Sequence, residues 1–352
     1  MIRVLRSSVG LFALGLTLGV VWATAAMAME PLPATPPVPK DNPQTKEKVN
    51  LGRQLFFDPR LSVTQTVSCN SCHNVMASGT DNRPTSFGVF GKKGGRSAPN
   101  VWNAAFLSVQ FWDGRAASLE DQAKGPILNP VEMGMPNEAA VVALIDGIPG
   151  YREQFQRVFG GKNPVTYDNI AKAIAAYERT LVTPNSPFDQ YKKGKKNAMS
   201  AQAIRGMKAV EELGCTTCHS GPNFAGPAMK TGEGFYQAFP MFPGSEYEKK
   251  YHLTDDKGRY EVTKNKNDMN HWRVPTWRNV ALTAPYFHNG SVATLEEAVR
   301  VMGKTQLDKN LDDKTVADIV AFLNSLTGQF PAQTMPVLPP TPNTTTLPEA
   351  GR

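Results

Sequence analysis

Apolar residues return every three or four positions in five segments of the chain, which is the spacing of one face of an α-helix. The segments are 46–57, 168–181, 200–213, 294–302 and 312–326. Long stretches rich in glycine and proline lie between them, and alternating, strand-like patterns are weak. The pattern predicts a mainly α fold with long irregular loops, in which each apolar stripe packs into a core.

Capping residues mark the ends of three of these helices. Ser200 is a suitable N-cap and Gly214 a suitable stop for the third segment. Thr294 and Glu297 have the spacing of a capping box at the start of the fourth segment. Gly328 follows the fifth. These signals indicate where the helices are expected to begin and end.

The N-terminus has the pattern of an export signal. Arg3 and Arg6 precede an apolar run from Val9 to Ala26, and a small-x-small cleavage motif ends at Ala28. We therefore expect residues 1–28 to be a signal peptide and the rest of the chain to be exported to the periplasm. Because the apolar run is long, an uncleaved membrane anchor is the alternative.

The remaining chain is long enough for two domains. We expect a proline-rich lead-in at 29–44, domains at 45–182 and 183–330, and a disordered or extended tail at 331–352 that is rich in Pro and Thr. A Pro- and Lys-rich segment at 183–197 would join the domains.

One short motif, C-x-x-C-H, occurs twice and uses all four cysteines of the chain. The first copy comprises Cys69, Cys72 and His73, and the second comprises Cys215, Cys218 and His219. Two thiols at this spacing can form thioethers with the two vinyl groups of a haem, and the adjacent histidine then becomes the proximal iron ligand. A thioredoxin-like redox pair, a zinc half-site or a disulfide would explain a single copy. Two intact copies, each after a predicted helix, favour two covalently bound haem c groups in tandem domains.

The formal net charge of +7 does not indicate a nucleic-acid partner. Arg3 and Arg6 leave with the signal peptide, and each haem adds about two negative propionates. No basic cluster interleaved with aromatic residues occurs in the chain. We therefore predict no nucleic-acid binding.

Three further segments are recognisable by their residues. They are Q-F-W-D-G-R at 110–115, G-P-I-L-N-P-V-E-M-G at 125–134 and A-P-Y-F-H-N-G at 284–290. With the two haem motifs, they make residues 45–330 resemble the bacterial dihaem cytochrome c peroxidases, a broad family that includes the MauG-type enzymes. The resemblance implies two cytochrome c-like domains, a homodimer, and a calcium ion between the two haems.

The resemblance also implies a role for each haem. His73 matches the proximal ligand of the peroxidatic haem, and His219 matches that of the electron-accepting haem. Met302 matches the methionine that completes the second haem, where a thioether stabilises ferrous iron and raises the potential. Trp112 matches a tryptophan that bridges the haems for electron transfer. Without the resemblance, Met302 and Trp112 would be interpreted as core residues.

Glu132 and Gln122 match polar residues on the open face of the peroxidatic haem, although either alone would be interpreted as a surface residue. Splitting hydrogen peroxide requires a proton to move between its oxygens, and a carboxylate in a partly apolar pocket has a raised pKa suited to this task. A neutral amide can orient the peroxide.

The calcium ion implied by the family would be bound by oxygen ligands. Thr283 and Pro285 match positions whose carbonyls face this ion, and Ser97 occupies a position where the family has an asparagine.

The main departure from the family is Val89. The family usually has a histidine here, which caps the peroxidatic iron in the oxidised state and leaves on half-reduction. No histidine lies between His73 and His219, so a cap would have to be Met133, Met135 or a group from the other domain. We therefore predict an enzyme that needs no reductive activation.

Three functions follow from these residues. The first is reduction of hydrogen peroxide to water with electrons from a small periplasmic cytochrome c or a cupredoxin. The second is a MauG-like oxidation of residues in a partner protein, but those enzymes have a tyrosine where Met302 stands here. The third is a non-enzymatic dihaem electron carrier or peroxide sensor, which would have no use for the residues around Glu132.

Overall fold

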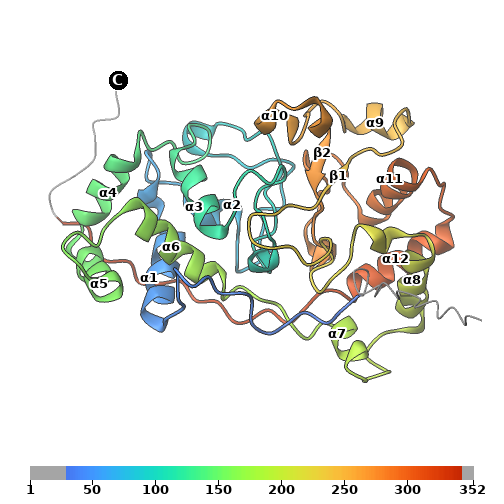
Figure 1. Cartoon of the computed structure of the whole chain (residues 1–352), viewed down its shortest axis with the longest axis horizontal. Coiled ribbons are helices and arrows are strands. Elements are labelled where there is room, and N and C mark those ends of the chain that lie inside the picture. The colour runs from blue at the N-terminus through green and yellow to red at the C-terminus, as the bar shows by residue number, and fades with distance from the viewer. Residues whose placement is uncertain (1–28, 343–352) are drawn as a thin grey trace, which may run out of the picture.

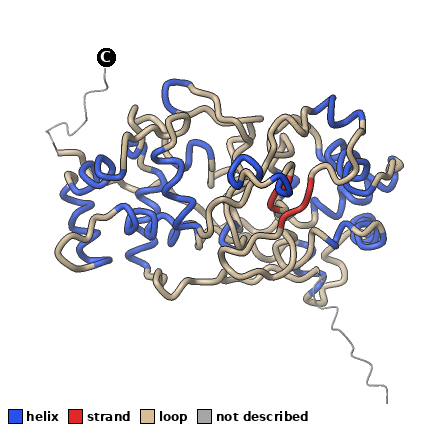
Figure 2. Tube along the Cα trace, turned by 45° about the horizontal axis from the view of Figure 1, so that its top comes forward, coloured by secondary structure: helices blue, strands red, loops and turns tan. Residues whose placement is uncertain are grey.

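The computed structural model describes residues 29–342, so the predicted signal peptide and residues 343–352 of the predicted tail lie outside the described residues. Within this range the chain is mainly helical, as predicted, and loops form most of the rest (Figure 2). The α-helices are α1 Lys46–Phe57, α2 Cys69–Cys72, α3 Leu119–Leu128, α4 Glu138–Asp146, α5 Pro149–Phe159, α6 Tyr167–Glu178, α7 Pro187–Lys192, α8 Ala201–Glu212, α9 Glu246–Tyr251, α10 Tyr260–Thr263, α11 Leu295–Leu307 and α12 Asp313–Asn324. The strands are β1 Tyr236–Ala238 and β2 His271–Arg273.

All five helices that the apolar stripes predict are present. The hydroxyls of Ser200 and Thr294 cap α8 and α11 by accepting a hydrogen bond from the main-chain N–H three residues further on. The capping box at Thr294 is only half formed. The Glu297 carboxylate accepts a hydrogen bond from the Tyr251 hydroxyl instead of returning to the helix start.

Each C-x-x-C-H motif follows a helix that packs across a second, later helix. α1 precedes the first motif and crosses α6, whereas α8 precedes the second motif and crosses α12 (Figure 1). Each crossing depends on a glycine: a Cβ on Gly52 would overlap the carbonyl of Ala173, and a Cβ on Gly206 would overlap the carbonyl of Asp318. We call α1–α6 the first lobe and α7–α12 with the two strands the second lobe.

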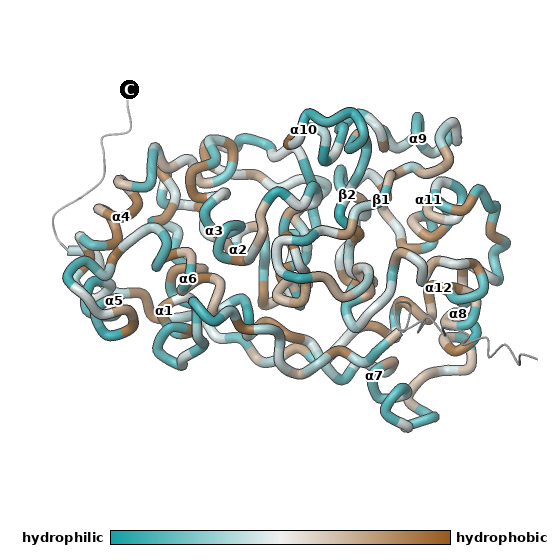
Figure 3. Tube along the Cα trace, viewed as in Figure 1, coloured by the Kyte–Doolittle hydropathy of each residue, from teal (hydrophilic) through white to brown (hydrophobic). Residues whose placement is uncertain are grey.

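The hydrophobic residues form separate clusters in the two lobes (Figure 3). The cluster of the first lobe includes Leu55 and Ile174, and that of the second lobe includes Val210 and Phe322. The predicted join between the domains contains α7, whose Phe188 is fully buried in the cluster of the second lobe. The helix therefore packs as part of that lobe and is not a free linker.

Irregular main chain fills the space between the two helix pairs. β1 and β2 pair antiparallel, with Tyr236 opposite Arg273. Three tight hairpins are each closed by one β-bridge, and they span 87–93, 110–116 and 286–292. The hairpin at 110–116 contributes to the cavity of the first motif, and the one at 286–292 contacts the first lobe through the hydrogen bond from the Ser97 N–H to the His288 carbonyl.

Both chain ends that the structure describes run from the second lobe to the first, along one edge of the molecule (Figure 1). The lead-in begins with Met29 in the cluster of the second lobe. The tail is an extended segment as far as residue 342. It is held by a hydrogen bond from the Tyr177 hydroxyl to Gln333 Oε1 of 2.9 Å and by one from Arg60 Nη1 to the Pro339 carbonyl of 2.9 Å. Within residues 29–342, no helix has the length and apolar character needed to cross a membrane.

Candidate functional site

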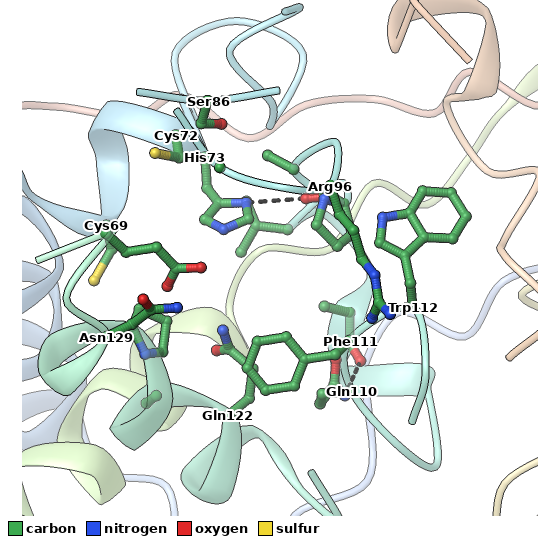
Figure 4. A pocket seen from close by; sticks show the side chains of 18 of the residues that line it. Cys69, Cys72, His73, Ser86, Arg96, Gln110, Phe111, Trp112, Gln122 and Asn129 are labelled. Atoms are coloured by element: carbon green, nitrogen blue, oxygen red, sulfur yellow. Dashed lines mark hydrogen bonds between the residues drawn. The ribbon is translucent and has the colours of Figure 1, made fainter. Parts of the chain in front are cut away.

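The first C-x-x-C-H motif opens onto a cavity of about 490 Å³ in the first lobe, to which the second lobe contributes Asp256 and Arg273 (Figure 4). This volume is in the range of cofactor sites. Helix α2 holds both cysteines, and His73 follows as its C-cap. The cavity is lined by six of the residues expected from the sequence to form the peroxidatic site: Cys69, Cys72, His73, Trp112, Gln122 and Glu132.

The His73 ring is oriented by a main-chain carbonyl of a distant segment. Its Nδ1 donates a hydrogen bond of 2.9 Å to the Pro99 carbonyl, which can only accept. Burial lowers the pKa of His73, so the ring is neutral at pH 7. The second nitrogen, Nε2, therefore has a free lone pair, as a metal-binding histidine requires.

The environment of the motif thiols differs from that of a catalytic redox pair. All four cysteines are free. Burial raises the pKa of Cys69 and Cys72, and it raises the pKa of Cys215 to about 11. Catalytic C-x-x-C thiols have lowered pKa values, because the thiolate is the reactive form. This electrostatic environment disfavours the thioredoxin-like alternative.

Glu132 and Gln122 line the same cavity from two connected segments. Gln122 lies on α3, and Glu132 lies in the turn after that helix, where its N–H donates to the Asn129 carbonyl at 3.0 Å. Burial raises the pKa of Glu132, and Arg115 opposes that shift. Met133 also lines the cavity, whereas Met135 is buried elsewhere in the first lobe.

The hairpin around Val89 is packed against the segment that holds Glu132. The Val89 N–H donates a 2.9 Å hydrogen bond to the Glu132 carbonyl. The Val89 side chain is 1% exposed and belongs to the core of the first lobe, not to the wall of the cavity. Gly88 allows this approach, because a Cβ there would overlap the carbonyls of Val131 and Glu132. The side chain at the position of the family histidine is therefore directed into the core.

Trp112 and His288 occupy matching places in two hairpins. In both hairpins, a phenylalanine with positive φ precedes the residue, at Phe111 and Phe287. The Trp112 and His288 rings meet edge to face, with centroids 6.5 Å apart, and Trp112 Nε1 donates to the Ser97 carbonyl at 2.8 Å. No contact of His288 was predicted from its sequence. The likeness between Q-F-W-D-G and Y-F-H-N-G was the signal that could have paired them.

The second motif lies on the far side of this region, in the second lobe. His219 Nδ1 donates to the Phe224 carbonyl at 3.1 Å, and burial lowers the pKa of His219 to about 4. The ring stacks on Trp277 with centroids 4.3 Å apart. As in the first motif, Nε2 is the nitrogen left free for a metal.

Met302 is half-buried on α11. It packs with the hydrophobic cluster that also contacts Trp112, whereas Cys215 packs with the neighbouring cluster. Val280 and Leu295 contact both clusters. The role of Met302 as an iron ligand stays a prediction.

Two of the three residues expected near calcium form hydrogen bonds with main-chain carbonyls. The Ser97 N–H donates to the His288 carbonyl at 2.7 Å, and Thr283 Oγ1 donates to the Val280 carbonyl at 3.1 Å. The peptide bond before Pro285 is cis. Residues 29–342 contain no group of three or more His, Cys, Asp or Glu side chains that could hold a metal. Because the expected donors are of other types, the calcium site stays a prediction.

The first cavity contains buried polar atoms that have no hydrogen-bond partner in the protein, as expected of a site for a haem with its polar groups. Asn100 Nδ2 and Glu178 Oε2 are buried, line the cavity and form no hydrogen bond within the protein. Buried polar atoms are normally paired, so such atoms indicate a ligand with polar groups. Mostly apolar walls, two adjacent thiols and a histidine with a free Nε2 match the remaining parts of a haem.

Comparison with known proteins gives consistent matches. The family described as di-haem cytochrome c peroxidase matches residues 46–197. The chain is 45% identical to cytochrome c551 peroxidase from Pseudomonas aeruginosa over 92% of this chain and 91% of that protein. It is 44% identical to cytochrome c551 peroxidase from Nitrosomonas europaea over 94% of this chain and 95% of that protein.

A solved structure has the same fold. It is the crystal structure of a MauG-like protein associated with microbial copper homeostasis, with a TM-score of 0.73 and 29% identity. The match covers 87% of this chain and 95% of that protein. Together these matches confirm the resemblance found in the sequence: the chain belongs to the di-haem cytochrome c peroxidase family of oxidoreductases.

Proposed function

We propose that the protein reduces hydrogen peroxide to water, using two protons and two electrons for each peroxide. The proposal rests above all on the first cavity, which brings His73, Gln122 and Glu132 together. Two haems would be bound covalently, one through Cys69 and Cys72 and one through the cysteines of the second motif. His73 and His219 would be their proximal ligands.

The residues around the first cavity suit proton transfer. When bound, the haem supplies a redox-active iron on which peroxide can be reduced. The Glu132 carboxylate would accept a proton from one peroxide oxygen and return it to the other as the O–O bond breaks. Its raised pKa brings it nearer to neutral pH, where such a group works in both directions. The Gln122 amide would orient the peroxide without exchanging a proton.

Electrons would enter at the second haem, where His219 and Met302 would ligate the iron. Trp112 would pass them to the first, since it lies in the wall of the first cavity and in the cluster that contacts Met302. We propose a small cytochrome c or a cupredoxin as the donor. This assignment agrees with a periplasmic location, which the predicted signal peptide supports.

We also propose that the oxidised enzyme reacts with peroxide directly. A capping histidine is replaced by Val89, whose side chain is directed into the core and has no lone pair to offer an iron. Hydrogen bonds and close packing fix its hairpin against the Glu132 segment. Loss of the switch would also weaken any dependence on calcium bound by Ser97, Thr283 and Pro285. A homodimer remains part of this proposal by family resemblance.

Steady-state turnover of peroxide with a reduced cytochrome c tests the activity. We expect saturable turnover far above that of free haem. Turnover no better than that of free haem would overturn the proposal. If peroxide still oxidised the protein in that case, oxidation of a partner protein would become the better hypothesis.

Low-temperature EPR of the fully oxidised protein tests the absence of a cap. We expect the first haem to be at least partly high-spin and to react with peroxide without added reductant. Two low-spin signals and no reaction would show that some residue caps the iron. A Met133→Leu variant would then identify Met133 if one low-spin signal disappeared, with Met135→Leu as the control outside the cavity.

A further inference from the structure

Arg273 is a buried cation without an anionic partner. Three arginines of the described chain are almost fully buried: Arg179, Arg273 and Arg278. Arg179 pairs with Glu120, and Arg278 pairs with Asp189. Arg273 forms no ion pair within residues 29–342, although its side chain is buried on β2.

The guanidinium of Arg273 is held only by main-chain carbonyls. Nε donates to the Phe111 carbonyl at 3.0 Å, and Nη1 donates to the Val274 carbonyl at 3.0 Å. Burial lowers the pKa of Arg273 to about 10, so the group is still charged at pH 7. A buried charge without a counter-ion is costly, and buried charges in proteins are normally paired. The nearby Asp113 carboxylate attracts Arg273 electrostatically, but it forms its ion pairs with Arg96 and Arg115. Arg273 therefore has no counter-ion of its own among the described residues.

Arg273 also lines the first cavity, on the side that faces away from the cysteines. Its main-chain N–H donates to the Trp112 carbonyl at 2.9 Å, which fixes it beside Trp112. Figure 4 places Trp112 and Arg96 across the cavity from Cys69. In a haem, the two propionates are on the half of the ring opposite to the two vinyl-derived groups. A haem attached through Cys69 and Cys72 would thus direct its carboxylates toward Arg273.

Arg273 is the cation on this side that is available to a new anion. Arg96 already pairs with Asp113 and Asp256, and Arg115 also pairs with Asp113. We propose that Arg273 binds a propionate of the first haem and acts as its counter-ion from the second lobe. This inference rests on the proposed attachment of haem at the first motif. It adds that a single ion pair would connect the haem of the first lobe to β2 of the second lobe.

The ion pair would raise the reduction potential of the first haem, since a nearby positive charge favours ferrous over ferric iron. Redox titration of the holoenzyme, with the two haems distinguished by their spectra, measures this effect. In Arg273→Gln we expect the ratio of reduced to oxidised first haem at a fixed potential to fall about tenfold, which equals about 59 mV for one electron. The second haem should shift much less.

Two further variants make the test specific. Arg273→Lys keeps the charge and should retain most of the wild-type potential. Arg205→Gln, which removes a surface partner of Asp318 far from the cavity, should leave both potentials unchanged. Equal shifts of both haems, an unchanged first haem in Arg273→Gln, or a loss in Arg273→Lys as large as in Arg273→Gln would overturn the proposal.

A crystal structure of the haem-loaded wild-type enzyme decides the question even if Arg273→Gln does not fold. We expect a propionate oxygen within hydrogen-bond distance of the Arg273 guanidinium. Propionates bound only by other groups would refute the ion pair. Because this test needs no turnover, it is independent of whether the protein proves to be a peroxidase.

Discussion

At the scale of single residues, burial sets the protonation of the groups around the first motif. Burial lowers the pKa of His73 and raises the pKa of Glu132. It also raises the pKa of Glu178 to about 8, so that this carboxyl is largely neutral at pH 7. A haem at this site would therefore have the neutral His73 ring on one side. On the other side it would have the Glu132 carboxyl group, whose raised pKa suits it to exchange protons near neutral pH.

Glu132→Gln keeps the size of the side chain and removes its ionisable proton. Because the carboxylate form acts as the base, the wild-type rate with peroxide should rise with pH through the Glu132 pKa, which lies above its ordinary value of 4.5. The variant should be slower by about 10²–10⁴-fold and lose that rise. Rapid mixing across pH 4–8 measures both, and Glu138→Gln, which removes an exposed carboxylate, is the control. A variant rate within a factor of a few of wild type would assign the proton transfer to another group.

Met302→His tests the predicted ligand of the second haem. Imidazole stabilises ferric iron better than a thioether does, so the variant should keep six-coordination but lower the potential of the second haem. Redox titration measures the shift, and electron entry from a reduced cytochrome should slow in parallel. Met241→His, at a methionine that is 47% exposed, should change neither. An unchanged second haem in Met302→His would mean that another residue is the ligand.

At the scale of elements, the sequence predicted what depends on local periodicity. The stripe at 46–57 became α1 with both ends as expected, and the caps at Ser200 and Thr294 are where the sequence placed them. Contacts between distant segments had no such signal. The partners of Gly52 and Gly206 and the burial of Val89 depend on main chain that is remote in sequence.

The lack of a local sequence signal for long-range contacts also explains which residues of the candidate site could be predicted. The motif residues and Glu132 could be found from the sequence, because short local patterns mark them. Arg273 could not, since an arginine on a three-residue strand has no local sign of being buried. Its position beside Trp112 becomes visible only when both lobes are folded.

Gly52→Ala and Gly206→Ala should each destabilise one helix crossing. The added Cβ would overlap a carbonyl of the partner helix, and overpacking of this kind costs about 1–3 kcal/mol or more. Denaturant unfolding followed by helical circular dichroism measures the loss. Gly95→Ala is the matched control, because a Cβ there meets no atom within 4 Å. If the two crossing variants are as stable as the control, the helices of each pair can move apart to admit the added Cβ without loss of free energy of unfolding.

At the scale of the whole molecule, the lead-in is tied to both lobes by polar side chains. In the second lobe, the Leu32 N–H donates to Asp189 Oδ1 at 3.0 Å, and Arg278 Nη2 donates to the Glu30 carbonyl at 3.0 Å. In the first lobe, Asn42 Nδ2 donates to Glu120 Oε1 at 2.7 Å. The lead-in thus connects the two lobes through contacts that involve neither haem motif.

The Arg278–Asp189 pair is the anchor of this connection, because both side chains are 0% exposed and their atoms lie 2.8 Å apart. Asp189→Asn should lower the free energy of unfolding by about 3–5 kcal/mol, since it leaves the Arg278 charge buried without a partner. The lead-in should also become more sensitive to proteolysis. Asp313→Asn, which breaks an ion pair whose carboxylate is 96% exposed, should cost less than about 1 kcal/mol. Replacing both buried partners, with Asp189→Leu and Arg278→Met, should recover much of the loss, because no unpaired charge then remains inside. If Asp189→Asn unfolds like the exposed-pair control, the charge of Arg278 must already be solvated, and the lead-in is held by its main-chain contacts alone.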